Sequence, residues 1–197
     1  MIAITEIAPR PLKRSGEFSV IRNPPDIIPP PDGEIILLPN VCVEYGLNWK
    51  TAAGLACGNS DRDPEVERVE SLYVEPKYPS VSCDFICLRY LVGRCYLPHA
   101  LNWARQGQFG GYVLELTTPR QVFAIGALYD DLHHQLPGDR LAILYSTKTC
   151  RDDGFKKLIG VRWNIDSRTT FLDKVPDYSF PFEWFVFLRK AAHVFTI

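Results

Sequence analysis

Apolar and polar residues follow one another along the chain in short runs that predict several strands. Alternating or compact apolar segments bounded by Pro, Gly or Asn are typical of strands that are half or fully buried. We therefore expect strands over five segments, which are 34–39, 69–76, 112–116, 140–146 and 157–165.

Other segments have the spacing of an amphipathic helix, or are apolar on nearly every side. The pair Thr118-Pro119 provides a cap and a first-turn proline for one of these helices. The segment 82–95 is so apolar that we expect it to be a buried helix. Helices are predicted over five segments, which are 48–56, 82–95, 98–106, 119–134 and 183–195.

The order of these elements predicts an α+β fold. A strand, a helix and a strand from 112 to 146 indicate a crossover unit, followed by a strand that can pair antiparallel. Seven prolines within residues 1–33 forbid a regular helix there and favour an extended backbone. We expect a proline-rich extended arm over 1–33 and a single α+β domain over 34–197, with a central mixed sheet and packed helices.

Composition narrows the classes of function. The chain has 197 residues, 46% of them hydrophobic, so it can bury a core without a metal or a disulfide. A net charge of −1 argues against a general nucleic-acid binder, although a local basic patch stays open. No apolar run has the length of a signal peptide or a membrane span. We expect a cytoplasmic or nuclear protein whose six cysteines are reduced.

Cys83, Cys87, Cys95 and His99 lie within seventeen residues. Three thiolates and one imidazole satisfy the tetrahedral coordination of zinc. The fragment CLRYLVGRC at 87–95 resembles the opening half of a CCCH zinc finger, and the resemblance implies a zinc-stabilised binding module. The sequence departs from that pattern after Cys95, because His99 follows directly and only Cys83 supplies the third thiol. The alternative is that these thiols pack in the core as small apolar groups.

The segment RQGQFGGYVLELTTPRQVFAI at 105–125 resembles part of the ADP-ribosyltransferases. The resemblance implies an enzyme that consumes NAD and needs an upstream arginine, a Ser-rich strand and a downstream glutamate. For these roles the chain offers Arg89 or Arg94, the run Ser80-Val81-Ser82, and Asp130 or Asp131 in place of glutamate, because residues 116–182 contain no Glu. The candidates taken forward are Arg94, Ser82 and Asp131.

The sequence as a whole favours binding over catalysis. No GxxxxGK[ST], GxGxxG, HExxH or GxSxG pattern occurs, which excludes the common nucleotide hydrolases, dinucleotide dehydrogenases, zinc proteases and serine hydrolases. Aromatic residues gather near the C-terminal end of the chain, at Tyr178, Phe180, Phe182 and Trp184. We therefore expect a non-enzymatic interaction or regulatory domain that binds a protein partner and no membrane, with the NAD-consuming enzyme and the zinc module as alternatives.

Overall fold

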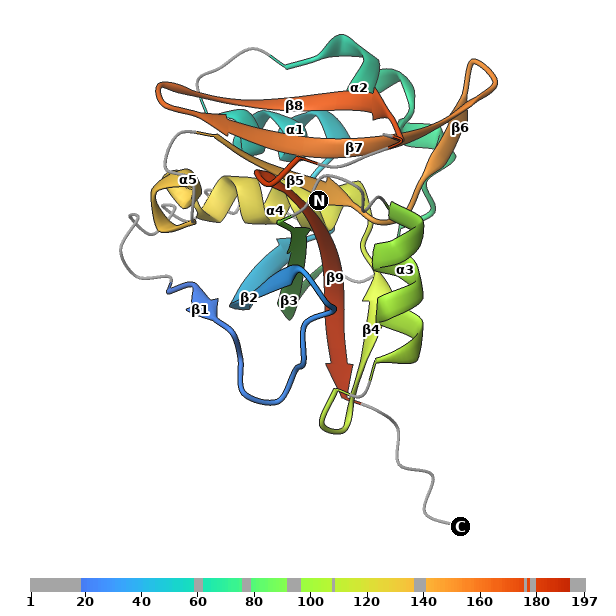
Figure 1. Cartoon of the computed structure of the whole chain (residues 1–197). Coiled ribbons are helices and arrows are strands. Elements are labelled where there is room, and N and C mark those ends of the chain that lie inside the picture. The colour runs from blue at the N-terminus through green and yellow to red at the C-terminus, as the bar shows by residue number, and fades with distance from the viewer. Residues whose placement is uncertain are drawn as a thin grey trace.

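The computed structural model shows an α+β fold in which helices pack on both faces of one mixed sheet (Figure 1). It describes residues 19–58, 62–75, 79–91, 97–107, 109–136, 141–175, 177 and 180–191. The helices are α1 (Trp49–Cys57), α2 (Pro64–Arg68), α3 (Leu97–Gln106), α4 (Pro119–Leu128) and α5 (Leu132–Gln135), with a 3-10 turn η1 (Glu70–Leu72). No helix in these ranges is long and apolar enough to cross a membrane.

The sheet contains nine strands in the order β1-β2-β3-β9-β5-β7-β6, with β4 paired to β9 and β8 paired to β7. Of the strand pairs formed by the described residues, β5 with β9 is parallel and the others are antiparallel. The strand bounds are β1 (Ile21–Arg22), β2 (Gly33–Glu44), β3 (Ser80–Tyr90), β4 (Tyr112–Leu116), β5 (Ala142–Ser146), β6 (Cys150–Asp152), β7 (Phe155–Asn164), β8 (Ser167–Lys174) and β9 (Glu183–Ala191).

Strand β9 organises the sheet because it pairs with three strands. One side of β9 pairs with β3, while its first half pairs with β5 and its second half with β4. Strands β4 and β5 therefore lie end to end along β9 and run in opposite directions, so the expected crossover unit at 112–146 is wrong. Their ends meet at Val186, whose carbonyl accepts hydrogen bonds from the Oγ1 atoms of Thr117 (2.7 Å) and Thr147 (2.8 Å).

The central strands send alternate side chains into two cores. Phe85 and Cys87 point to the face covered by α1 and α4, whereas Ile86 and Leu88 point to the other face. Helix α3 covers only part of that second face, where it contacts β4 and β9 (Figure 1). We call this second, partly covered side the α3 face. Surface hollows can form where α3 leaves it uncovered.

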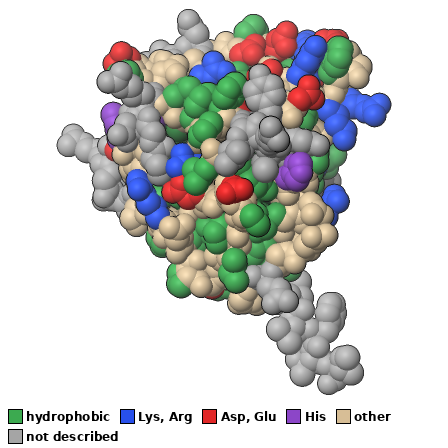
Figure 2. Space-filling model, in the orientation of Figure 1, with side chains coloured by type: hydrophobic (Ala, Val, Ile, Leu, Met, Phe, Trp, Pro, Cys, Tyr) green, Lys and Arg blue, Asp and Glu red, His purple; other side chains and the backbone are tan. Residues whose placement is uncertain are grey.

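A cluster of charged side chains joins α2 to the β6–β7 hairpin. Asp152 accepts hydrogen bonds from Arg68 (Nη2–Oδ2, 2.7 Å) and Lys157 (Nζ–Oδ2, 2.6 Å). Hydrogen bonds from these two cations lower the pKa of Asp152 to about 2. Figure 2 shows acidic and basic side chains gathered over α2 and β6. The cluster fastens a hairpin that otherwise pairs only through three residues of β6.

Several predicted elements are confirmed, namely the helices at 48–56 and 98–106 and the strands at 34–39, 112–116, 140–146 and 157–165. The helix expected at 119–134 is two helices, because α4 ends at Leu128 and α5 begins at Leu132.

Three predictions are wrong. The segment expected as a buried helix at 82–95 contains most of β3, and the helix expected at 183–195 begins as β9. The central residues of both strands are buried on both faces, so nearly every side chain there is apolar, as in a buried helix. The strand expected at 69–76 contains η1, where Val69 and Tyr73 are buried one turn apart.

Candidate functional site: a groove beside the proline segment

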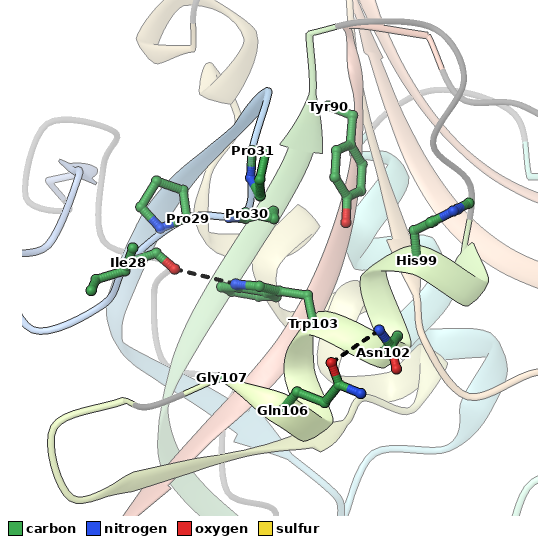
Figure 3. Close-up of a pocket in the computed structure, with 10 residues that line it drawn as sticks. All are labelled: Ile28, Pro29, Pro30, Pro31, Tyr90, His99, Asn102, Trp103, Gln106 and Gly107. Carbon is green, nitrogen blue, oxygen red and sulfur yellow. Dashed lines mark hydrogen bonds between the residues drawn. The ribbon is translucent and has the colours of Figure 1, made fainter.

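A hollow on the α3 face lies between residues 28–31 and α3, and we call it the proline groove (Figure 3). Its volume is about 560 Å³. Most of its lining is apolar, and its polar side chains come from α3 and from Tyr90 at the end of β3. The lining residues are Ile28, Pro29, Pro30, Pro31, Tyr90, His99, Asn102, Trp103, Gln106 and Gly107.

The proline wall is fixed by a tight turn at the start of β2. The Gly33 N–H donates to the Pro30 carbonyl (2.9 Å), and Asp32 adopts a positive φ of 58° within the turn. A Cβ at Gly33 would lie 2.6 Å from Pro30 Cγ, so the turn needs glycine there. The Leu91 N–H donates to the Asp32 carbonyl (2.8 Å), which fastens the turn to the end of β3.

The chain before the prolines is held down as well. Ile27 is buried in the core of the α3 face, and β1 pairs with β2. Asp26 forms an ion pair with Arg189 of β9, whose guanidinium carbon lies 3.7 Å from the centre of the Tyr112 ring. The described part of the expected arm therefore lies against the domain, and its prolines form one wall of the groove.

Helix α3 forms the opposite wall because its sequence has two different sides. Leu97, Ala100 and Ala104 are buried against the sheet. The side chains that face the groove include Asn102 and Trp103 (Figure 3).

Hydrogen bonds and ring contacts order this wall. The indole N–H of Trp103 donates to the Ile28 carbonyl across the groove (3.2 Å), and the ring packs edge-on against Phe109 and Phe187. The side-chain amide of Asn102 donates to Gln106 Oε1 (3.2 Å).

The lining residues define what the groove can do chemically. They include no Cys, Ser, Asp, Glu, Lys or Arg, and the titratable side chains among them are Tyr90 and His99. Rings of proline, tyrosine and tryptophan can bury an apolar group, while the amides of Asn102 and Gln106 can hydrogen-bond a polar one. This combination is suited to binding.

The residues expected to bind zinc are not brought together in the described part of the chain. Cys83 and Cys87 are four residues apart on β3, which separates their Cα atoms by about 13 Å. Burial raises the pKa of both thiols and so disfavours the thiolates that zinc needs. His99 lies across the sheet from Cys87, and Cys95 lies outside the described residues.

The described residues contain no group of three His, Cys, Asp or Glu side chains that could hold a metal ion. Cys87 is fully buried in the core beneath α4, so the described structure supports the alternative of packed core thiols for that residue. The zinc site itself stays a prediction.

The residues expected for the NAD-consuming enzyme are placed as follows. Ser82 is exposed on β3, opposite Cys42 of β2. Asp131 precedes α5, and its Oδ1 accepts a hydrogen bond from Gln135 Nε2 (3.0 Å). No hydrogen bond joins Ser82 to Asp131, and Arg94 lies outside the described residues. That activity also stays a prediction.

Sequence reasoning missed Tyr90 and Trp103 as site residues. The sequence does contain a signal for Trp103. Leu97, Ala100 and Ala104 form the buried side of α3, and this spacing places the indole beside that side, at the edge of the helix. The pattern at 82–95 predicts a helix, so it does not predict that Tyr90 lies at the end of a strand beside the groove. No protein-family model, no curated protein and no solved structure matches this chain.

Proposed function

We propose that this protein is a non-enzymatic binding domain that docks a protein partner in the proline groove. The observation that carries the proposal is the composition of the groove, in which proline and aromatic rings face one another and hydrogen-bonding groups come from α3. Proteins use such apolar hollows with a few polar groups to bind and orient a ligand.

An extended segment of the partner with an apolar side chain fits this groove best. Ile28 is 77% exposed at its edge, so an apolar group that enters there removes further apolar surface from water. The amides of Asn102 and Gln106 can exchange their mutual hydrogen bond for bonds to the partner's backbone. The walls are already held in place by hydrogen bonds, which lowers the entropy lost on binding.

Charge and thiol chemistry support a protein partner in a reducing compartment. The described lining has no Lys or Arg to neutralise phosphates, which argues against nucleic acid in this groove. Free thiols of the described residues include Cys57, Cys83, Cys87 and Cys150. Free thiols are typical of cytoplasmic or nuclear proteins, so we propose that location.

A displayed library of random peptides, selected on the immobilised full chain, tests the proposal. We expect selected peptides to carry apolar residues and to change the fluorescence of Trp103. Ile28→Asp should weaken their binding at least about tenfold, because it places a charge at the edge of the apolar wall. Asn102→Arg should weaken it by filling the groove.

The matched control is Arg105→Ala, an exposed position of α3 that does not line the groove. Its Kd for the selected peptides should equal that of the unmodified protein. Peptides that bind all these variants equally well, or a selection that yields no binder, would overturn the proposal.

A further inference from the structure

A second hollow lies on the α3 face at the other end of β9, and we call it the Arg162 pocket. Its volume is about 340 Å³. Strands β5, β7, β8 and β9 all contribute to it, together with the segment that leads into β9. It is lined by Leu141, Ile143, Tyr145, Arg162, Asn164, Asp173, Phe180, Phe182 and Glu183. None of these residues lines the proline groove.

Arg162 is the most unusual member of this lining. Its Nε atom is buried and has no hydrogen-bond partner, and no carboxylate of the described residues lies within ion-pair distance of the guanidinium. Its guanidinium carbon lies 4.8 Å from the centre of the Phe171 ring, and its charge acts on Glu183 from beyond ion-pair distance. Buried polar groups in proteins nearly always have a partner. A guanidinium that lines a pocket, with a buried Nε lacking a hydrogen-bond partner and no carboxylate of the described residues at ion-pair distance, is therefore a place for an anionic group.

In the described part of the chain, Glu183 has no cation at ion-pair distance, just as Arg162 has no carboxylate. Its carboxyl is buried at the start of β9 and accepts hydrogen bonds from the Tyr145 hydroxyl (3.1 Å) and the Phe180 N–H (2.7 Å). No cation of the described residues lies within ion-pair distance of it, and burial raises its pKa, while its two hydrogen bonds and the more distant charge of Arg162 oppose the shift. Asp173 adds a second, exposed carboxylate to the same lining. These carboxyls mark a place for a cationic group beside the place for an anion.

Apolar side chains complete the lining. Ile143 and Leu141 come from β5 and the residue before it, and Phe180 and Phe182 stack on each other with ring centres 5.2 Å apart. Phe180 is 45% exposed although it lies beside a pocket. A ligand with an apolar body can cover these side chains and exclude water from the charged groups.

We propose that the Arg162 pocket binds a free α-amino acid with an apolar side chain. The carboxylate of the ligand pairs with Arg162, its ammonium group pairs with Glu183 and Asp173, and its side chain packs on the apolar lining. A neutral aromatic ligand would bring no group of opposite charge within ion-pair distance of Arg162 or of Glu183. A simple anion would satisfy Arg162 and would be repelled by both carboxylates. A zwitterion is the small ligand that satisfies both ends.

Thermal unfolding of the full chain with millimolar leucine, methionine or phenylalanine tests this proposal. We expect at least one of them to raise the Tm progressively as its concentration increases, with a logarithmic dependence above the Kd, because it binds only the native state. The methyl ester lacks the carboxylate and the N-acetyl derivative lacks the ammonium group. Each should bind at least about tenfold more weakly than the free amino acid, since each leaves one buried charge unpaired.

Substitutions locate the ligand. Arg162→Gln and Asp173→Asn should each weaken binding at least about tenfold. Asp173 is exposed, so that variant keeps the test valid if Arg162→Gln unfolds. Arg151→Gln is the matched control, because Arg151 is an exposed arginine of the neighbouring strand β6 that does not line the pocket.

Four outcomes would overturn the proposal. The first is that none of the three amino acids raises the Tm. The second is that the methyl ester or the N-acetyl derivative binds as well as the free ligand. The third is that Asp173→Asn binds like the unmodified protein. The fourth is that Ile28→Asp abolishes the effect, which would place the ligand in the proline groove. The proposed docking of a protein partner is independent of all four.

Discussion

At the scale of single residues, His133 is a buried side chain that makes the stability depend on pH. It is 5% exposed, and neither of its ring nitrogens has a hydrogen-bond partner. Burial and then the neighbouring His134, whose ring centre is 3.9 Å away, lower its pKa below the usual 6.5, while Asp131 opposes the shift. The unfolded chain therefore binds a proton at a pH where the native protein does not.

Stability should accordingly fall as the pH decreases below about 6.5, until the lowered pKa of the folded state is reached. Urea unfolding at a series of pH values between 8 and 5 measures this slope. His133→Leu should remove the part of the slope that His133 contributes, and His134→Ala should reduce it. A slope that is identical in His133→Leu and in the unmodified protein would contradict the assignment.

Arg120 joins the start of α4 to the segment before α1. It pairs with Glu75 (Nη2–Oε2, 2.6 Å), donates to the carbonyls of Leu47 (2.8 Å) and Asn48 (3.2 Å), and is 4% exposed. Arg120→Ala should destabilise the protein by about 3 kcal/mol, because it leaves the Glu75 carboxylate and two carbonyls without their donor. The denaturant midpoint measures the loss.

The control for Arg120 is an ion pair on the surface. Lys190 and Glu115 lie 2.6 Å apart with both side chains about half exposed. Lys190→Ala should cost less than about 1 kcal/mol, because water screens this pair. Equal losses in the two variants would show that the burial of Arg120 contributes little.

At the scale of elements, β7 needs a glycine where β5 and β8 approach it. A Cβ at Gly160 would lie 2.7 Å from Phe171 Cζ and 2.8 Å from the Leu144 carbonyl oxygen. Gly160→Ala should therefore destabilise the protein by about 1–3 kcal/mol, since a backbone atom cannot move away as a side chain can. Lys156→Ala, at an exposed position of the same strand, should change stability by less than about 0.5 kcal/mol.

The elements also show which patterns a sequence reveals. Strand β4 and helix α3 were found because one side of each is apolar and Gly or Pro marks their ends. Strands β3 and β9 were assigned to helices because side chains such as Phe85 and Ile86 are buried on opposite faces. Periodicity carries no information when every position is buried, and only the partners of a strand then decide its structure.

At the scale of the whole molecule, the candidate sites depend on contacts between distant segments. The sequence patterns suggest a metal ligand at His99 and an extended arm at the prolines of 29–31, with no link between the two. The fold places them around one groove. Arg162 and Glu183 are far apart in sequence and share a pocket because β5 lies between their strands. The proline-rich arm, the aromatic residues near the C-terminal end and the lack of a complete catalytic motif favour binding, but no local pattern predicts where a binding site lies.

The two cores should unfold together, because they share strands. Residues of β3 and β9 alternate between the α1–α4 side and the α3 face, so the loss of either core exposes the strands that support the other. Fluorotryptophan resonances can test this, since Trp49, Trp163 and Trp184 lie in the first core and Trp103 packs against the second. We expect all four to lose intensity at one urea concentration that coincides with the loss of circular dichroism. A lower midpoint for Trp103 alone would instead show that α3 and the proline groove detach from an intact sheet, and the groove would then be a locally unstable site.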